Sequence, residues 1–199
     1  MYSGITRGLY EVTHVEKLPG LIIYTIRLSA ELLDNLKTGA SVSIDGVCQT
    51  VVSIREDGVT FNAIQETLEK TTLNTLHPGR KVSVERSLRY GDEIGGHEVA
   101  GHIIGTAKIS EIKSSENNVR MTLRCPQEWM KYILPKGFIA VDGSSLTVDY
   151  ADPMGAFTVH LIPETLRLTN FGNKQIGDRV NIELDHRTQA IVATVEGKK

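Results

Sequence analysis

The chain has no long hydrophobic run, few aromatic residues and no excess of basic charge. Because no apolar run approaches the roughly 20 residues of a membrane-spanning helix, we expect no membrane partner. Residues 1–4 lack the basic n-region and apolar core of a signal peptide, which predicts a cytoplasmic protein. The 22 Lys and Arg are balanced by 24 Asp and Glu, and 6% of residues are aromatic. With neither a basic groove nor stacking aromatics, we expect no nucleic-acid partner.

Cysteine is also scarce. In a chain expected in the cytoplasm, Cys48 and Cys125 are interpreted as free thiols, and two cysteines cannot form a zinc site alone. His97 and His102 stand five positions apart, but no Cys or carboxylate cluster accompanies them at a ligand spacing, so no metal is expected. The glycines match neither a P-loop nor a dinucleotide fingerprint. Ser145 lacks the Gly-x-Ser-x-Gly elbow of hydrolases.

What the sequence does contain is an internal repeat that covers most of the chain. A shift of 97 positions places residues 3–8 on 100–105 and residues 42–51 on 139–148. A shift of 98 places residues 66–68 on 164–166 and residues 79–85 on 177–183. Blocks that recur in the same order at nearly one offset indicate a duplication.

Each repeat has the pattern of a small β structure. Short apolar alternations bounded by Gly, Pro, Asp or Asn predict strands over 21–28, 41–44, 58–63 and 81–85. Helical stretches are expected over 30–36 and 127–134, a joint over 87–97 and a helical tail over 188–196. Many short strands at close spacing are typical of barrels and sandwiches. The sequence therefore predicts an all-β fold of two similar small Greek-key barrels in tandem, followed by a short C-terminal helix.

Positions that differ between the repeats are candidates for chemistry. Cys48 is equivalent to Ser145, and Ile5 is equivalent to His102. A thiol, a hydroxyl and an imidazole serve nucleophilic and acid–base catalysis. Taken alone, Cys48 is more typical of a small buried apolar residue than of a nucleophile, and His102 is equally typical of a satisfied core histidine.

The pairs Glu66-Thr67 and Glu164-Thr165 recur after an apolar strand in each repeat. They could offer carboxylate, hydroxyl and backbone groups at one barrel mouth. Alternatively, they begin the next turn or helix, where acidic residues are favourable. As pocket residues they would suit a polar heterocycle with a hydroxylated tail, because phosphorylated ligands would need more Lys or Arg.

Several blocks match one protein family in order, and together they resemble riboflavin synthase of the alpha-chain type. The blocks are Gly4-Ile5, residues 46–51, residues 66–68 with 71–73, residues 95–97 with Gly101-His102, residues 136–137 with 142–148, and residues 161–166. The resemblance covers residues 1 to about 186. The sequence departs from the family pattern at Tyr2, Thr6, Gln49 and Asn170.

The resemblance implies a transferase of riboflavin biosynthesis. Two molecules of 6,7-dimethyl-8-ribityllumazine exchange a four-carbon unit and yield riboflavin and 5-amino-6-(D-ribitylamino)uracil. It implies lumazine-binding barrels over residues 1–90 and 98–186, a helix or tail over 187–199, and neither metal nor organic cofactor. It also implies a homotrimer with active sites between subunits, and an association with lumazine synthase. The alternative is a noncatalytic lumazine- or flavin-binding antenna, the lumazine protein.

The resemblance also assigns residues. It implies that Cys48, His102 and Ser145 are catalytic and that His97, Lys136, Asp142, Thr147 and Asp185 support the site. In one barrel it places the substrate-binding residues Gly4, Ile5, Thr6, Cys48, Gln49, Thr50, Asn62, Ala63, Ile64, Gln65, Glu66 and Thr67. In the other it places Gly101, His102, Ile103, Lys136, Ser145, Leu146, Thr147, His160, Leu161, Ile162, Pro163, Glu164 and Thr165.

Overall fold

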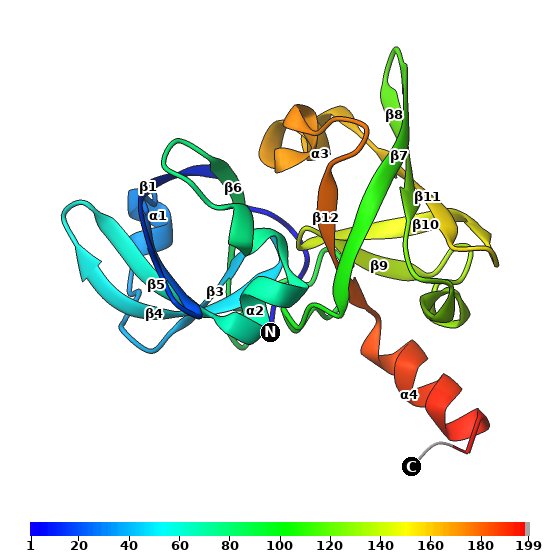
Figure 1. The fold of residues 1–199 in the computed structure, drawn as a ribbon, viewed down its shortest axis with the longest axis horizontal. Helices are drawn as coiled ribbons and strands as arrows, with labels where there is room; N and C mark the ends of the chain where they lie inside the picture. Colours follow the sequence, from blue (N-terminus) through cyan, green and yellow to red (C-terminus); the bar gives the residue numbers. More distant parts are fainter. Residues whose placement is uncertain (198–199) are drawn as a thin grey trace.

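The computed structural model describes residues 1–197 and contains two closed six-stranded barrels side by side (Figure 1). Around the first barrel the order is β1-β2-β5-β4-β3-β6, and the second repeats it with β7 in the place of β1. Strands of the first are β1 (Leu9–Leu18), β2 (Leu21–Ile26), β3 (Ser41–Ile44), β4 (Val47–Arg55), β5 (Gly58–Ile64) and β6 (Lys81–Arg86). Strands of the second are β7 (Gly105–Ser115), β8 (Asn118–Arg124), β9 (Phe138–Val141), β10 (Ser144–Asp152), β11 (Ala156–Leu161) and β12 (Arg179–Leu184). The predicted duplicated all-β fold is confirmed.

The helices are shorter than the sequence predicted. The helix expected over 30–36 is only α1 (Ala30–Leu33), and Asn35 takes a left-handed φ of 54° just after it. The stretch expected over 127–134 is a 3-10 helix, Gln127–Tyr132, which follows Pro126. Two helices that the sequence analysis left open are α2 (Gln65–Lys70) and α3 (Pro163–Leu168). Each is followed by a 3-10 turn, Thr72–Thr75 and Asn170–Asn173 respectively.

Each barrel encloses its own core. The first interior is filled from all six strands and includes Tyr24 and Phe61, whose stacked rings have centroids 5.5 Å apart. The Tyr24 hydroxyl donates to the Gln49 side chain at 3.1 Å, so this buried polar group is satisfied. The second interior packs around the fully buried Phe157. Alternating apolar residues therefore point inward in both barrels, as the period of a strand requires.

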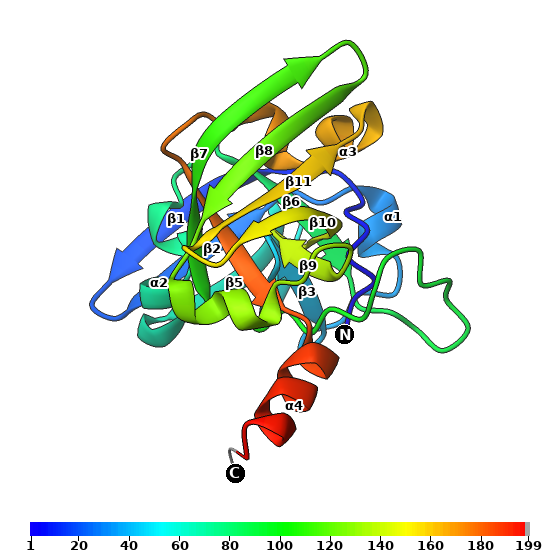
Figure 2. The ribbon, with the colours of Figure 1, turned by 90° about the vertical axis from the view of Figure 1, so that its right-hand side faces the viewer.

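The C-terminal helix α4 (His186–Val195) projects away from both barrels (Figure 2). Asp185 caps it, because its carboxylate accepts hydrogen bonds from the Thr188 amide and hydroxyl, both at 2.7 Å. Near its end, Glu196 pairs with Lys131 at 2.7 Å. The predicted tail ends with Lys198 and Lys199, which lie outside the described residues. Within residues 1–197, no helix is long and apolar enough to cross a membrane.

The barrels meet at two equivalent Asp-Gly turns. Asp45 and Asp142 adopt left-handed φ angles of 45° and 43° and are both completely buried. The Asn170 amide donates to both carboxylates, at 2.9 Å each. Arg80 lies 2.8 Å from Asp45, and Lys174 lies 3.1 Å from Asp142. Each buried carboxylate therefore has its own cation, and one amide joins the two.

Two carboxylates so close together in a buried site cannot both ionise easily. Burial, with the charge of Asp142 second, raises the pKa of Asp45 from its ordinary 3.8 to about 6, although Arg80 opposes the shift. The folded protein therefore binds a proton at Asp45 more tightly than the unfolded chain does.

This proton gives a testable pH dependence of stability. Between about pH 4 and pH 6 the folded state retains a proton that the unfolded chain loses, so the free energy of unfolding should fall as pH rises through this window. Asp45→Asn removes the group and should flatten the slope by up to about 1.4 kcal/mol per pH unit. Urea denaturation at several pH values measures both slopes. Parallel curves for the two proteins would contradict the proton assignment.

Candidate active site

The segments that lead into the two barrels each cross to the opposite barrel. Gly4, which precedes β1, accepts a hydrogen bond through its carbonyl from the Ser145 amide of β10 at 2.8 Å. Gly101, which precedes β7, accepts one from the Cys48 amide of β4 at 2.9 Å. Both glycines have a positive φ, and a Cβ on either would overlap the residue that it faces. Only glycine allows this approach.

This crossing corrects the sequence analysis. From the resemblance, Gly4–Thr6 were expected in the same barrel as Cys48, and Gly101–Ile103 in the same barrel as Ser145. The structure exchanges the two segments. A sequence repeat identifies equivalent segments, but it does not tell which barrel each segment contacts.

A cavity of about 310 Å³ lies where residues 101–103, which lead into the second barrel, meet the first barrel. We call it the Cys48 pocket; its lining residues are Val47, Cys48, Glu66, Thr67, Lys70, Thr71, Gly101, His102 and Ile103. The structure thus brings together Cys48 and His102, two of the predicted catalytic residues. Sequence reasoning missed Val47, Lys70 and Thr71. Val47 and Thr71 lie within matched blocks, and Lys70 lies next to one, which was their only signal in the sequence.

Cys48 receives a hydrogen bond at its sulfur. The Tyr2 hydroxyl, whose side chain is completely buried, donates to Cys48 Sγ at 3.2 Å. Burial, followed by the hydrogen bond to Cys48, raises the pKa of Tyr2 far above its ordinary 10, so the phenol stays protonated. Backbone hydrogen bonds between Tyr2 and Val99 hold the ring in place. The thiol is therefore oriented by a fixed donor at the start of the chain.

Ser145, the second-barrel counterpart of Cys48, has an imidazole as its hydrogen-bond partner. His97 Nδ1 and Ser145 Oγ are joined by a hydrogen bond of 2.6 Å. The His97 ring stacks on Phe138, with centroids 5.0 Å apart. Burial lowers the pKa of His97 below its usual 6.5, and the charge of Asp185 opposes the shift. A neutral imidazole beside a hydroxyl is suited to accept or pass a proton.

Lys136 and His160 lie together on the second barrel, around Asp149. The Lys136 ammonium is 3.7 Å from the Asp149 carboxylate, and His160 Nε2 is 3.2 Å from it. His160 Nδ1 also contacts the Asn118 amide at 2.6 Å. The hydrogen bond from His160 lowers the pKa of Asp149. Because Lys136 is mostly exposed, it remains accessible to a polar ligand.

Two of the expected supporting residues serve the framework. Asp142 lies in the buried contact between the barrels, and Asp185 caps α4. The remaining one, Thr147, lies exposed on β10, directly opposite Phe138 of β9.

The Glu-Thr pairs begin helices, as the alternative interpretation proposed. Glu66 stands in the first turn of α2 and pairs with Lys70 at 2.8 Å. Glu164 stands in the first turn of α3 and pairs with Arg167 at 2.6 Å. β5 and β11 have ended before these pairs. Glu66 and Thr67 nevertheless line the Cys48 pocket, so a helix start and a pocket wall coincide there.

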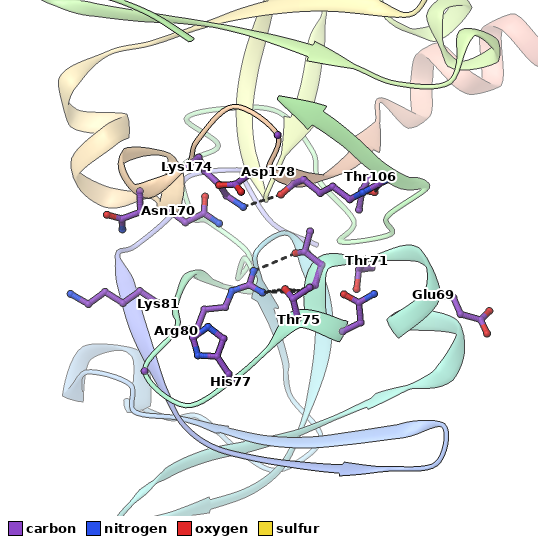
Figure 3. Close-up of a pocket in the computed structure, with 16 residues that line it drawn as sticks. Glu69, Thr71, Thr75, His77, Arg80, Lys81, Thr106, Asn170, Lys174 and Asp178 are labelled. Atoms are coloured by element: carbon purple, nitrogen blue, oxygen red, sulfur yellow. Dashed lines mark hydrogen bonds between the residues drawn. The ribbon is translucent and has the colours of Figure 1, made fainter. Parts of the chain in front are cut away.

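A second, larger cleft of about 1200 Å³ opens between the barrels (Figure 3). Its walls are polar, and two of the four Lys and Arg residues that line it, Arg80 and Lys174, are already paired with the buried Asp45 and Asp142. Its lining residues include neither cysteine nor serine. The Cys48 pocket is therefore the better candidate for chemistry despite its smaller size. Among residues 1–197, no three or more His, Cys, Asp or Glu side chains form a group that could hold a metal.

Comparison with known proteins agrees with this duplicated geometry. The family model described as "Lumazine binding domain" matches residues 3–87 and again residues 100–185. Riboflavin synthase of Escherichia coli (strain K12) is 46% identical over 197 residues, which are 98% of this chain and 92% of that protein. Riboflavin synthase of Chlamydia pneumoniae is 42% identical over 196 residues, covering 98% and 96%. The chain belongs to the riboflavin synthase family.

The fold has a solved counterpart. The crystal structure of LumP complexed with riboflavin superimposes with a TM-score of 0.86 at 24% identity, covering 94% of this chain and 100% of that one. At this identity the likeness establishes the shared double-barrel fold.

The stacked Phe138 gives a test of the His97 environment. Phe138→Ala removes one face of the ring's cover, so the His97 pKa should rise toward its usual 6.5. NMR titration of the imidazole C2 proton measures the midpoint. Tyr150→Ala, which removes another exposed ring from the same barrel, is the control and should leave the midpoint unchanged. A lowered or unaltered midpoint in Phe138→Ala would show that stacking does not desolvate His97.

Proposed function

We propose that this chain is a riboflavin synthase, a transferase that converts two molecules of 6,7-dimethyl-8-ribityllumazine into riboflavin and 5-amino-6-(D-ribitylamino)uracil. The observation that carries the proposal is the 46% identity to a riboflavin synthase over 98% of the chain. The pocket that combines Cys48 and His102 supports it, because the reaction needs a nucleophile and a proton carrier.

In this proposal residues 1–90 and 98–186 form two lumazine-binding barrels, and each binds one substrate molecule. Because each leading segment contacts the opposite barrel, its residues are grouped with the binding residues of that barrel. One lumazine binds against Cys48–Thr50, Asn62–Thr67 and Gly101–Ile103. The other binds against Gly4–Thr6, Lys136, Ser145–Thr147 and His160–Thr165.

The chemistry divides between unlike pockets. One lumazine accepts a nucleophile at its C7 carbon, while the other loses a proton from its acidic 7-methyl group. Cys48 and Ser145 supply the contrasting thiol and hydroxyl, and His102 carries a proton at the Cys48 pocket. His97 holds the Ser145 hydroxyl by their 2.6 Å hydrogen bond. The ring system of the substrate delocalises the resulting charge, so the resemblance implies no further cofactor.

We further infer that the protein is cytoplasmic, acts as a homotrimer and associates with lumazine synthase. In the trimer the first barrel of one subunit faces the second barrel of its neighbour. Two exposed apolar side chains near Ser145, Ile5 beside Gly4 and Phe138 stacked on His97, support a covered surface there. Sedimentation of the purified protein measures the assembly, and co-sedimentation with lumazine synthase tests the association.

Incubation with 6,7-dimethyl-8-ribityllumazine as the sole substrate tests the activity. Riboflavin should accumulate, detected by its absorbance and fluorescence after chromatography, with a chelator present throughout. Binding of the lumazine without any conversion would instead favour the antenna alternative. Absence of both binding and conversion would overturn the assignment altogether.

The two thiols should differ in importance. Cys48→Ser should lower turnover at least about tenfold because it replaces the sulfur in the pocket. Cys125→Ser is the matched control and should be mild, because Cys125 packs against Met130 and its burial raises the thiol pKa to about 11. Steady-state rates of both variants, with circular dichroism to verify folding, provide the comparison. Equal losses in the two variants would return Cys48 to a packing role.

A further inference from the structure

We propose that Glu85 and Glu183 are positioning residues, each holding the backbone segment that completes the pocket of the opposite barrel. The two occupy equivalent positions at the ends of β6 and β12, at the repeat shift of 98. Both are almost completely buried, with 4% and 2% exposure. The inference rests on the proposed function only in treating these pockets as substrate sites.

Both carboxylate oxygens of Glu85 accept hydrogen bonds from Ser3 and Gly4, in the segment that leads into the first barrel. Its Oε1 accepts hydrogen bonds from the Ser3 amide and the Ser3 hydroxyl, each at 2.7 Å. Its Oε2 accepts one from the Gly4 amide at 3.1 Å. The carbonyl of the same Gly4 then accepts the Ser145 amide. Two successive hydrogen bonds thus connect a first-barrel carboxylate to the backbone amide of Ser145 in the second barrel.

Glu183 makes the mirror arrangement. Its Oε1 accepts from the Ala100 amide at 2.6 Å, and its Oε2 from the Gly101 amide at 2.8 Å. Gly101 in turn accepts the Cys48 amide and lines the Cys48 pocket beside His102. A second-barrel carboxylate therefore holds a wall of the first-barrel pocket.

The chemistry of these contacts requires a carboxylate. A carboxylate offers acceptors at both oxygens, which match two neighbouring N–H donors. A glutamine of equal size would direct an NH₂ group at one of those donors and leave a buried N–H without a partner. If these side chains only filled space, glutamine would replace glutamate without effect. The Glu→Gln substitution therefore distinguishes a hydrogen-bonding role from a packing role.

The two anchors differ in one respect that bears on catalysis. Glu183 Oε1 lies 3.4 Å from His186 Nε2, and the His186 ring meets the His102 ring edge-on, with centroids 6.3 Å apart. In the first repeat, Leu88 stands at the position equivalent to His186. Glu183 therefore contacts the backbone of the Cys48 pocket directly, and it contacts the His102 imidazole indirectly through His186.

Alkylation of thiols in the full-length protein tests the crossing without any ligand. Glu183→Gln should accelerate iodoacetamide labelling of Cys48 by roughly tenfold, since one of the two charge-assisted hydrogen bonds to the covering segment is lost and the other becomes neutral. Glu85→Gln should raise that rate less than Glu183→Gln does, because the segment that it frees reaches Cys48 only through the Tyr2 hydroxyl, and the backbone pairing of Tyr2 with Val99 remains. Peptide mass spectrometry reads Cys48 and Cys125 in one sample, and an unchanged Cys125 rate shows that the second barrel stays folded.

The reciprocal arm uses a Cys48→Ser, Ser145→Cys background. There, Glu85→Gln should accelerate labelling at position 145 and Glu183→Gln should not. Gly101→Ala offers a second route, because its Cβ would overlap Cys48 and displace the same segment, and it should reproduce the faster Cys48 labelling. Equal acceleration of Cys48 by both glutamine variants, or none by Glu183→Gln, would overturn the crossed assignment.

Turnover in the same preparations separates this inference from the proposed function. If the wild-type protein converts the lumazine, Glu183→Gln should lower kcat as well as raise KM, because His102 moves with its segment. If the wild-type protein does not convert the lumazine, the proposed function fails while the labelling pattern still decides the crossing. Glutamine variants with wild-type kcat and KM in an active protein would overturn the positioning role.

Discussion

The buried contact between the two Asp-Gly turns is the constraint on which the rest of the structure depends. Asp45 and Asp142 bring two carboxylates into a site without water access, and the shared Asn170 amide with Arg80 and Lys174 makes this tolerable. Removing one partner would leave a buried charge uncompensated, so the barrels have one favoured mutual orientation. That orientation brings each leading segment within reach of the opposite barrel.

Close approach at the crossing follows from the same orientation. Gly4 and Gly101 lie so near Ser145 and Cys48 that any side chain would push the segments off the strands. At each crossing, one backbone hydrogen bond joins the leading segment to β4 or β10, and the segment does not form a further strand. The Cys48 pocket is consequently built from both repeats, and a change in one barrel reaches the binding surface of the other.

The sequence predicted the duplication, the barrel class and the equivalence of Cys48 with Ser145, because these depend on local pattern and on alignment of the chain with itself. It did not predict the exchange of the leading segments, since that depends on how two closed surfaces dock. The predicted helix lengths were also wrong: the left-handed Asn35 follows the end of α1, and residues 127–132 form a 3-10 helix. The hydrogen bond between His97 and Ser145 joins residues 48 positions apart, and no sequence spacing indicates it.

The symmetric frame is broken at positions that matter. At the barrel contact, Thr72 and Ser83 of the first repeat correspond to Asn170 and Asn181 of the second, and the amides make contacts that a hydroxyl could not span. Had both repeats carried threonine, the two carboxylates would have lacked their common donor. In the pockets, the pair Cys48 and Ser145 breaks the symmetry in the same way. Duplication supplies two sites of one shape, and these few differences give them unlike chemistry, which a reaction between two identical molecules in different roles requires.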